Sequence, residues 1–108
     1  MGDELEVESM KTGIELIAEE RERQISQEGW TAEHDDHHDN HEIALAAAAY
    51  AVPLRNDLIE VRKFLWPWSE SSFKWTPSQR VRELSKAGAL IAAEIDRISR
   101  LRDDDETL

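Results

Sequence analysis

One short segment of the sequence, GWTAEHDDHHDNHE at residues 29–42, gathers the side chains best suited to chemistry. It contains all four histidines of the chain, together with three aspartates and two glutamates. Imidazole nitrogens are ligands for Zn²⁺ and other transition metals, whereas carboxylate oxygens favour Mg²⁺ or Mn²⁺. The mixture indicates a divalent metal site but leaves the choice among Mg, Mn and Zn open. The candidate metal ligands are His34, Asp35, Asp36, His38 and Glu42.

Two other interpretations of this segment stay open. Its polar residues can cap the helix that follows, because Asp39 and Glu42 have the spacing of a capping box. Its histidines can also form a cluster that responds to pH. The four-residue spacing from His34 to His38 places both rings on one face only in a helix. We expect residues 31–40 to form a loop or a short turn instead.

A second candidate group lies on the helix before this segment. The apolar positions of that helix place Arg21 in the middle of its apolar stripe, with Glu20 and Gln24 at the edge. The carboxylates of the opposite, solvent-facing side are those of Glu15, Glu19 and Glu22. A buried arginine needs a carboxylate partner or a bound anion. Arg21 is therefore expected either to pair with a carboxylate such as Glu42 or Glu94, or to hold a phosphate.

Tryptophan supplies a third candidate group. Trp66, Trp68 and Trp75 lie in one proline-containing loop, and Trp30 lies in the histidine-rich segment. Such rings can stack on a nucleobase or close the end of a small helical bundle. We take Trp30 and Trp68 as candidate ligand contacts. Arg80, which follows the loop, is a further candidate for binding phosphate.

The elements that position these groups are predicted to be helices, because helical periodicity dominates and alternating strand patterns are absent. Four helices are expected, at about residues 7–27, 41–52, 56–65 and 76–102. Their ends are marked by Gly29, by Asp39 or Asn40, by Pro53, and by Thr76 with Pro77. The sequence therefore predicts an all-α fold, a small four-helix bundle with an aromatic loop before the last helix. It is expected to form one domain over residues 1–108, with frayed acidic tails at 1–8 and 103–108.

Two of the expected helices have distinctive apolar surfaces. The second is rich in alanine and apolar almost all round, so we expect it at the centre of the bundle. Its small side chains and the short chain also favour a homo-oligomer. Along the last helix, residues recur at spacings of three and four to form a seam that is expected to face the core: Val81, Leu84, Gly88, Ile91, Ile95 and Ile98.

Composition restricts the classes of partner. The net charge of −11 disfavours broad binding to the phosphates of DNA or RNA. No apolar run approaches the roughly 20 residues that cross a membrane, and the first residues lack the apolar segment of a signal peptide. The chain contains no cysteine, which excludes disulfides and thiolate metal ligands. The lack of cysteine is compatible with a reducing cytosol. A small anionic ligand stays compatible with the charge where a local basic cluster or a divalent metal offsets it.

Four segments together resemble a family of small proteins of bacteriophages and prophages. They are ERERQ (20–24), EGWTAEHDDHH (28–38), HEIALAAAAYA (41–51), and WPW with KAGALIAAEIDR (66–68 and 86–97). The resemblance covers about residues 15–101 and departs at His41, where the family has glycine, and at KWTP, where it has WWKP. It implies a protein that works in the cytoplasm of an infected or lysogenic bacterial host.

A more distant likeness is to the MazG-type all-α nucleotide pyrophosphohydrolases, small bundles that hold Mg²⁺ with helix carboxylates. Glu19 and Glu22 have the spacing of the ExxE pair of that family. Glu42, however, is followed three residues later by Leu45, where that family has aspartate. The likeness implies a helical bundle of similar size that acts on nucleotides.

Two functions follow from these candidates. The first is a metal-dependent nucleotide (pyro)phosphohydrolase, in which Glu20 and Asp36 take part in catalysis while Arg21 and Arg80 hold phosphates. The second is a binding protein without catalysis, which sequesters a nucleotide signal or inhibits a host defence protein. In that case the same Arg and Trp residues would bind the ligand.

Overall fold

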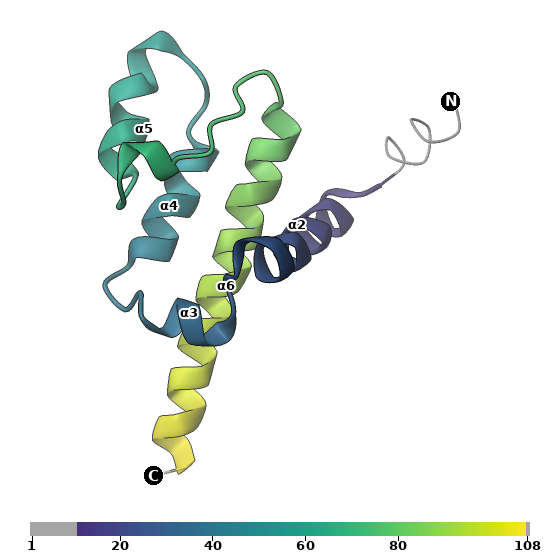
Figure 1. Cartoon of the computed structure of the whole chain (residues 1–108), viewed down its shortest axis with the longest axis vertical. Coiled ribbons are helices and arrows are strands. Elements are labelled where there is room, and N and C mark those ends of the chain that lie inside the picture. The colour runs from purple at the N-terminus through teal and green to yellow at the C-terminus, as the bar shows by residue number, and fades with distance from the viewer. Residues whose placement is uncertain (1–10, 108) are drawn as a thin grey trace.

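The computed structural model describes residues 11–107, with side chains described for residues 11–103, and this part of the chain is helical without strands (Figure 1). The framework consists of three longer helices: α2 (Gly13–Glu28), α4 (Glu42–Ala51) and α6 (Arg80–Thr107). Shorter elements connect them: α3 (Ala32–Asp36), η1 (Asn56–Leu58), α5 (Ile59–Leu65) and η2 (Glu70–Ser72). The predicted all-α class is confirmed.

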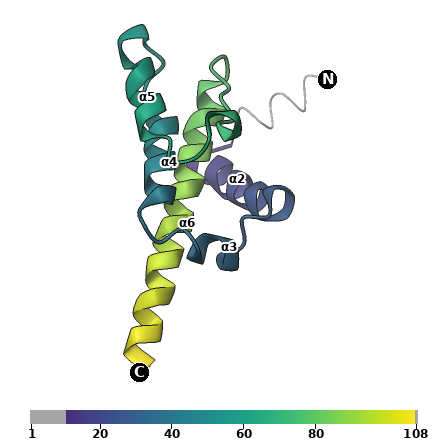
Figure 2. The same cartoon turned by 60° about the vertical axis from the view of Figure 1, so that its left-hand side comes forward.

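The four-helix bundle stays a prediction, but the expectation that the second helix, α4, lies at the centre is corrected. Helix α6, and not α4, is the central element, because α2, α3 and α4 all pack against it while α5 packs on α4 (Figures 1 and 2). In these views α4 and α2 lie on opposite sides of α6, and the C-terminal part of α6 extends beyond the other helices. None of the helices in the described range is long and apolar enough to cross a membrane.

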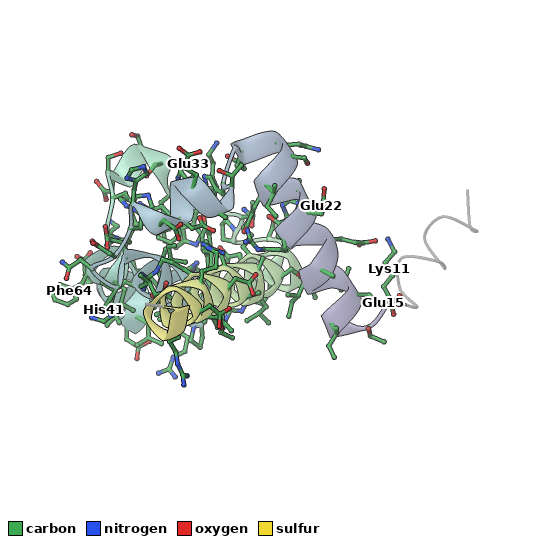
Figure 3. The ribbon with its side chains drawn as sticks, turned by 90° about the horizontal axis from the view of Figure 1, so that it is seen from below. Lys11, Glu15, Glu22, Glu33, His41 and Phe64 are labelled. Atoms are coloured by element: carbon green, nitrogen blue, oxygen red, sulfur yellow. The ribbon has the colours of Figure 1, made fainter. Side chains whose placement is uncertain are left out.

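Helix α2 is closed at both ends by local hydrogen bonds. The Thr12 side chain accepts from the backbone N–H of Glu15, and the Glu15 carboxylate accepts from the N–H of Thr12, which completes a capping box. Gly29 ends the helix in the left-handed conformation at φ 75°, as predicted. The expected earlier start, at Val7 or Ser9, lies outside the described residues. Glu22 lies at the exposed outer side of α2, as Figure 3 shows.

Helix α4 begins differently from the prediction. Its N-cap residue is His41, at φ 67° and ψ 10°, and no side chain caps the helix. The expected capping box led by Asp39 is therefore wrong. Glu42 instead turns its own carboxylate back, so that Oε1 accepts from the backbone N–H of Asn40 at 2.6 Å. Glycine adopts such a left-handed conformation without the steric penalty that a Cβ atom brings.

Helix α6 also begins later than expected, at Arg80. Residues 76–79 form a turn in which the Gln79 N–H donates to the Thr76 carbonyl. The Thr76 side chain, expected as the N-cap, leaves its Oγ1 buried without a hydrogen-bond partner. At the other end α6 continues to Thr107 beyond the predicted end near Arg102, so most of the expected C-terminal tail is helical.

The apolar seam predicted along α6 faces outward, which corrects the expectation that it faces the core. Val81, Leu84, Ile91, Ile95 and Ile98 are all exposed. At Gly88 the seam meets α2, because a Cβ atom there would lie 2.5 Å from Cδ1 of Ile17. The inner side of α6 instead carries small apolar residues and charged residues, all buried: Glu83, Lys86, Ala87, Leu90, Ala93, Glu94 and Arg97. Alanines of α4 and α6 pack there around Ile43, Tyr50 and Trp66.

Candidate functional site

Four rings from separate segments meet beside the start of α4, and we call Trp30, His34, His38 and Trp68 the ring cluster. Their contacts form a closed circuit. Trp30 stacks nearly parallel to His34 with centroids 6.0 Å apart, and His34 meets His38 edge-on at 4.9 Å. His38 meets Trp68 at 5.1 Å, and Trp68 lies 6.5 Å from Trp30. All four side chains are partly exposed, so the cluster forms part of the surface.

Short helix α3 is what brings these rings together. Thr31 caps it by accepting a hydrogen bond from the backbone N–H of His34, and the helix ends at Asp36. His34 and His38 therefore project toward the same side although His38 follows the helix. Trp68 reaches them from the loop after α5, where it also contacts buried Trp66 at 5.2 Å. The predicted loop at residues 31–40 is thus partly helical. The four-residue spacing of His34 and His38 therefore brings their rings together.

Each histidine of the cluster has a carboxylate at its Nδ1 atom. Nδ1 of His34 lies 3.0 Å from Asp35 Oδ1, and Nδ1 of His38 lies 3.3 Å from Glu42 Oε2. Burial alone would raise the pKa of Glu42, but hydrogen bonds from the backbone N–H groups of Glu42 and Asn40 and from His38 outweigh it, so the pKa lies below its usual value. Neither Nε2 atom has a hydrogen-bond partner in residues 11–103. Both imidazoles are therefore oriented and available at Nε2.

The two aspartates of the HDDHH run attach α3 to the framework. Asp35 is 2% exposed, and its Oδ2 lies 3.5 Å from NH2 of Arg21. Asp36 lies 2.7 Å from NH2 of Arg100, which also donates to the Ala32 carbonyl. The expected inward position of Arg21 is confirmed, since its side chain is 16% exposed. Its carboxylate partners are Asp35 and, at 3.9 Å, Asp96, and not Glu42 or Glu94.

The expected metal ligands are thus divided between two kinds of contact. His34 with Asp35 and His38 with Glu42 form pairs at the surface, while Asp36 turns to an arginine. Within the described part of the chain, no group of three or more His, Cys, Asp or Glu side chains is placed to hold a metal ion. A divalent metal at this segment stays a prediction.

Comparisons with protein-family models, curated proteins and solved structures give no match. What the site can do therefore follows from its own contacts. The resemblance to the phage family and the likeness to MazG-type enzymes stay predictions.

Glu20 and Gln24, the candidate catalytic and ligand-binding residues expected to point inward, are buried along α2. The Glu20 carboxylate accepts from Nε and NH2 of Arg23, the shortest contact being 2.7 Å. Glu20 also lines a separate polar groove of about 630 Å³ between α2 and the start of α6. Gln24 is 2% exposed, and its Oε1 has no hydrogen-bond partner. The Gln24 backbone carbonyl accepts a hydrogen bond from the Trp30 N–H at 3.0 Å. Within the described residues, no hydrogen bond or ring contact joins either side chain to the ring cluster.

Arg80, expected to bind phosphate, closes the end of α4. Its guanidinium donates to the backbone carbonyls of Tyr50, Ala51 and Val52, and it lies 3.4 Å from Glu83. These carbonyls are the unsatisfied acceptors at a helix C-terminus, where a cation is favoured. The structure therefore gives Arg80 a capping role away from the ring cluster.

A buried ion pair that the sequence analysis missed joins α5 to α6. NH2 of Arg62 donates to Glu83 Oε2 at 2.9 Å, and both side chains are fully buried. Nε of Arg62 donates to the Ala49 carbonyl, and its guanidinium lies 4.6 Å from the centre of the Trp75 ring. The available signal was that Arg62 lies four residues from both Leu58 and Trp66, on the inner face of α5.

Proposed function

We propose that this chain binds a nucleotide by stacking its base against the ring cluster, without a metal ion. The ring cluster is the observation that carries the proposal. It joins two indoles and two imidazoles from different segments on one partly exposed surface, and aromatic platforms of this kind bind bases through their faces. Trp30 and Trp68 are only partly buried and pack against the apolar core from outside it.

Part of the negative charge beside the cluster is compensated, although the whole chain carries −11. Arg21 and Arg100 lie against Asp35 and Asp36, so these two carboxylates are already compensated. The free Nε2 positions of His34 and His38 can each donate to a phosphate oxygen when they carry a proton. The site therefore offers rings for a base and imidazole donors for an anion next to each other.

Calorimetric titration with nucleoside mono-, di- and triphosphates tests the proposal in the presence of a metal chelator. We expect at least one nucleotide to bind under these conditions. Trp68→Ala should weaken its binding by about 5- to 150-fold, since base stacking contributes roughly 1–3 kcal/mol. The melting temperature of the variant has to be followed as well, because Trp68 contacts Trp66. Absence of binding across the nucleotide panel would overturn the proposal.

A matched pair of variants separates the site from general effects of substitution. His38→Gln removes the contact to Glu42 and a ring of the cluster. His37→Gln changes the neighbouring histidine, which is exposed and makes no side-chain hydrogen bond, ion pair or ring contact within the described residues. We expect only the first variant to weaken nucleotide binding.

The two imidazole–carboxylate pairs favour hydrolysis as a second candidate function. A carboxylate at Nδ1 orients an imidazole so that Nε2 can take a proton from water or bind a metal. Incubation with nucleotides and Mg²⁺, Mn²⁺ or Zn²⁺, followed by product analysis, distinguishes the two functions. Recovery of the intact nucleotide supports binding alone. Cleavage that His38→Gln abolishes and His37→Gln leaves unchanged would support a metal-dependent hydrolase.

A further inference from the structure

One carboxylate oxygen beside the ring cluster is buried without a hydrogen-bond donor. Asp35 is 2% exposed, and its Oδ1 lies 3.0 Å from Nδ1 of His34. Its Oδ2 lies 3.5 Å from NH2 of Arg21 but accepts no hydrogen bond within the described residues. A buried acceptor without a donor is unfavourable, and native structures leave few of them unexplained. A ligand that brings a donor to Oδ2 would remove this cost.

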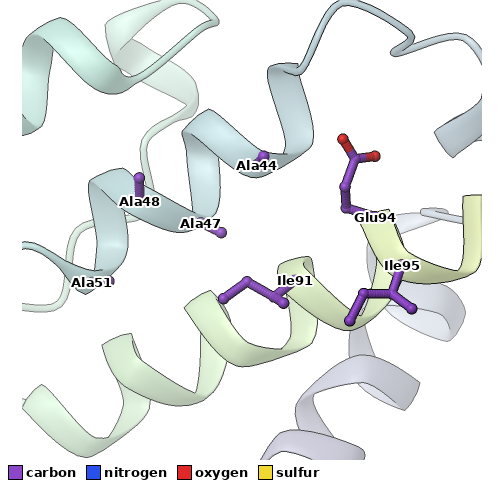
Figure 4. Close-up of a pocket in the computed structure, with 7 residues that line it drawn as sticks. All are labelled: Ala44, Ala47, Ala48, Ala51, Ile91, Glu94 and Ile95. Atoms are coloured by element: carbon purple, nitrogen blue, oxygen red, sulfur yellow. The ribbon is translucent and has the colours of Figure 1, made fainter. Parts of the chain in front are cut away.

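The groove between α4 and α6 offers no such atom. It measures about 220 Å³ and is lined by four alanines of α4 and by Ile91, Glu94 and Ile95 of α6, as Figure 4 shows. Glu94, the charged residue of this lining, is already paired with Arg97 at 2.6 Å. Recognition of a polar ligand is therefore better supported at Asp35 than in this groove.

The contacts around Oδ2 of Asp35 place it beside the gap between Trp30 and His34. On one side the same carboxylate meets the ring of His34 through Oδ1. On the other side Arg21, whose NH2 faces Oδ2, donates from NH1 to the backbone carbonyl of Trp30 at 3.4 Å. The unpaired oxygen is thus held between the residues that carry the two rings.

The rings of Trp30 and His34 are arranged as the walls of a slot for a third flat ring. Their planes differ by only 5°, and their centroids are 6.0 Å apart. A base between them needs walls about 7 Å apart, because carbon atoms in contact are separated by about 3.5 Å, so the rings have to part by at least about 1 Å. Trp30 lies between the C-cap of α2, Gly29, and the N-cap of α3, Thr31. The rings can therefore separate without a change inside either helix.

We propose that the base of the nucleotide inserts between Trp30 and His34 and that its exocyclic amino group donates to Asp35 Oδ2. This inference rests on the proposed function and narrows its ligand to nucleotides of adenine or cytosine, whose base edges carry such an amino group. Hypoxanthine and uracil carry a carbonyl oxygen at the same place. That oxygen would face the carboxylate as one acceptor against another, so these bases are disfavoured.

His34 also sets the direction in which the nucleotide lies. Its Nδ1 faces Asp35, and its Nε2 points nearly the opposite way, because the two nitrogens of an imidazole ring diverge. The amino edge of the base therefore lies on the Nδ1 side of the ring. The ribose and phosphate extend on the Nε2 side, where the imidazoles of His34 and His38 can donate to phosphate oxygens.

Calorimetric titration of the full chain with two matched pairs of nucleotides, in the presence of a metal chelator, tests the inference. Adenosine and inosine 5′-monophosphate differ by an amino group against a carbonyl, and so do cytidine and uridine 5′-monophosphate. We expect the amino member of each pair to bind about 10- to 150-fold more tightly, as a hydrogen bond to a charged acceptor implies. Equal affinities within the pairs, or a preference for the carbonyl members, would overturn the inference and leave base stacking intact. Absence of binding by all four nucleotides would overturn both proposals.

Asp35→Asn exchanges the acceptor for a donor. Its remaining oxygen can still accept from Nδ1 of His34 while its NH2 group takes the place of Oδ2, so the preference should disappear or reverse in favour of inosine and uridine. Asp57→Asn is the matched control, since Asp57 also pairs with an arginine, Arg55, at 2.7 Å but lies outside the ring cluster. It should keep the wild-type preference.

The melting temperature of Asp35→Asn has to be measured, because Asp35 also pairs with Arg21. The comparison of nucleotide pairs on the wild type does not depend on this variant. A folded Asp35→Asn protein that keeps the full preference for amino-bearing bases would contradict the role of Oδ2.

Discussion

At the scale of single residues, the backbone of His41 stores strain next to the ring cluster. Its φ of 67° is in the left-handed region, which only glycine adopts without a steric penalty. Its side chain is exposed and makes no capping hydrogen bond to α4. The turn is nevertheless required, because it lets the Glu42 carboxylate reach the N–H of Asn40 and the ring of His38.

His41→Gly is therefore expected to stabilise the protein. Removing the Cβ relieves the left-handed strain and should raise the free energy of unfolding by up to about 1 kcal/mol, after the greater flexibility of glycine in the unfolded chain is subtracted. Urea unfolding measures this value. Gly29→Ala provides the opposite comparison, since Gly29 has a φ of 75°, and should destabilise by about 1 kcal/mol. An unchanged or lower stability for His41→Gly would contradict the assignment of strain.

The position of a single residue could be predicted from the sequence where the local sequence pattern determines it. The inward position of Arg21 followed from helical phase, and the end of α2 followed from Gly29. The partners of these residues were not predictable. Asp36 pairs with Arg100, which is distant in the sequence, and no local rule selects that arginine over others on α6.

At the scale of elements, a buried ion pair connects α5 to α6. Arg62 and Glu83 are fully buried, and Glu83 also accepts from the N–H of Thr76 at 3.2 Å. Taking two charges out of water is unfavourable, so each depends on the other for compensation. This explains how a helix with charged residues on its inner side can pack against α4 and α5.

Arg62→Met should consequently destabilise the protein by about 3–5 kcal/mol, because Glu83 would stay buried with its main partner removed. Chemical denaturation of the variant measures this loss. Arg55→Met is the matched control, since Arg55 pairs with Asp57 at 2.7 Å on the surface. An exposed pair contributes about 1 kcal/mol or less. Equal losses for the two variants would show that the buried pair does not hold the helices together.

The orientation of α6 shows why periodicity alone misplaced an element. The seam from Val81 to Ile98 identified a helix correctly, but spacing does not reveal whether the partner belongs to the same chain. The other side of α6 carries alanines and paired charges, and this side packs against the rest of the chain. It can be buried because Arg62 and the loop after α5 supply partners for Glu83 and Lys86. Those partners become apparent only in three dimensions.

At the scale of the whole molecule, Tyr50 lies where α4, α6 and the aromatic loop meet. Its ring contacts Trp66 and Phe73, and its hydroxyl accepts from the Lys74 N–H at 3.0 Å. Burial, reinforced by the charges of Glu83 and Glu28, raises the pKa of Tyr50 to about 12. Ionisation of this hydroxyl therefore lowers the free energy of unfolding of the chain.

The pH dependence follows from that shift. The pKa of Tyr50 is higher in the folded chain than the ordinary value of 10.0, so its contribution to stability is full below pH 10 and is lost as pH rises toward about 12. Because the chain has one tyrosine, absorbance of tyrosinate reports this residue alone. We expect Tyr50→Phe to be less stable at neutral pH but to lose less stability than the wild type between pH 10 and 12. Parallel losses would contradict the shift.

Helix α6 is one continuous element, yet its surroundings change along its length. Up to Arg100 it is held by α2, α3 and α4, whereas its last turns extend past every other described helix. Protection of backbone amides against exchange with solvent depends on the free energy of local opening, which falls where tertiary contacts end. The helix should therefore fray from its C-terminal end up to the contacts of Arg100. The contacts of Arg100 with α3 therefore mark where the stable part of α6 ends. The same contacts hold α3, which carries His34 and precedes His38.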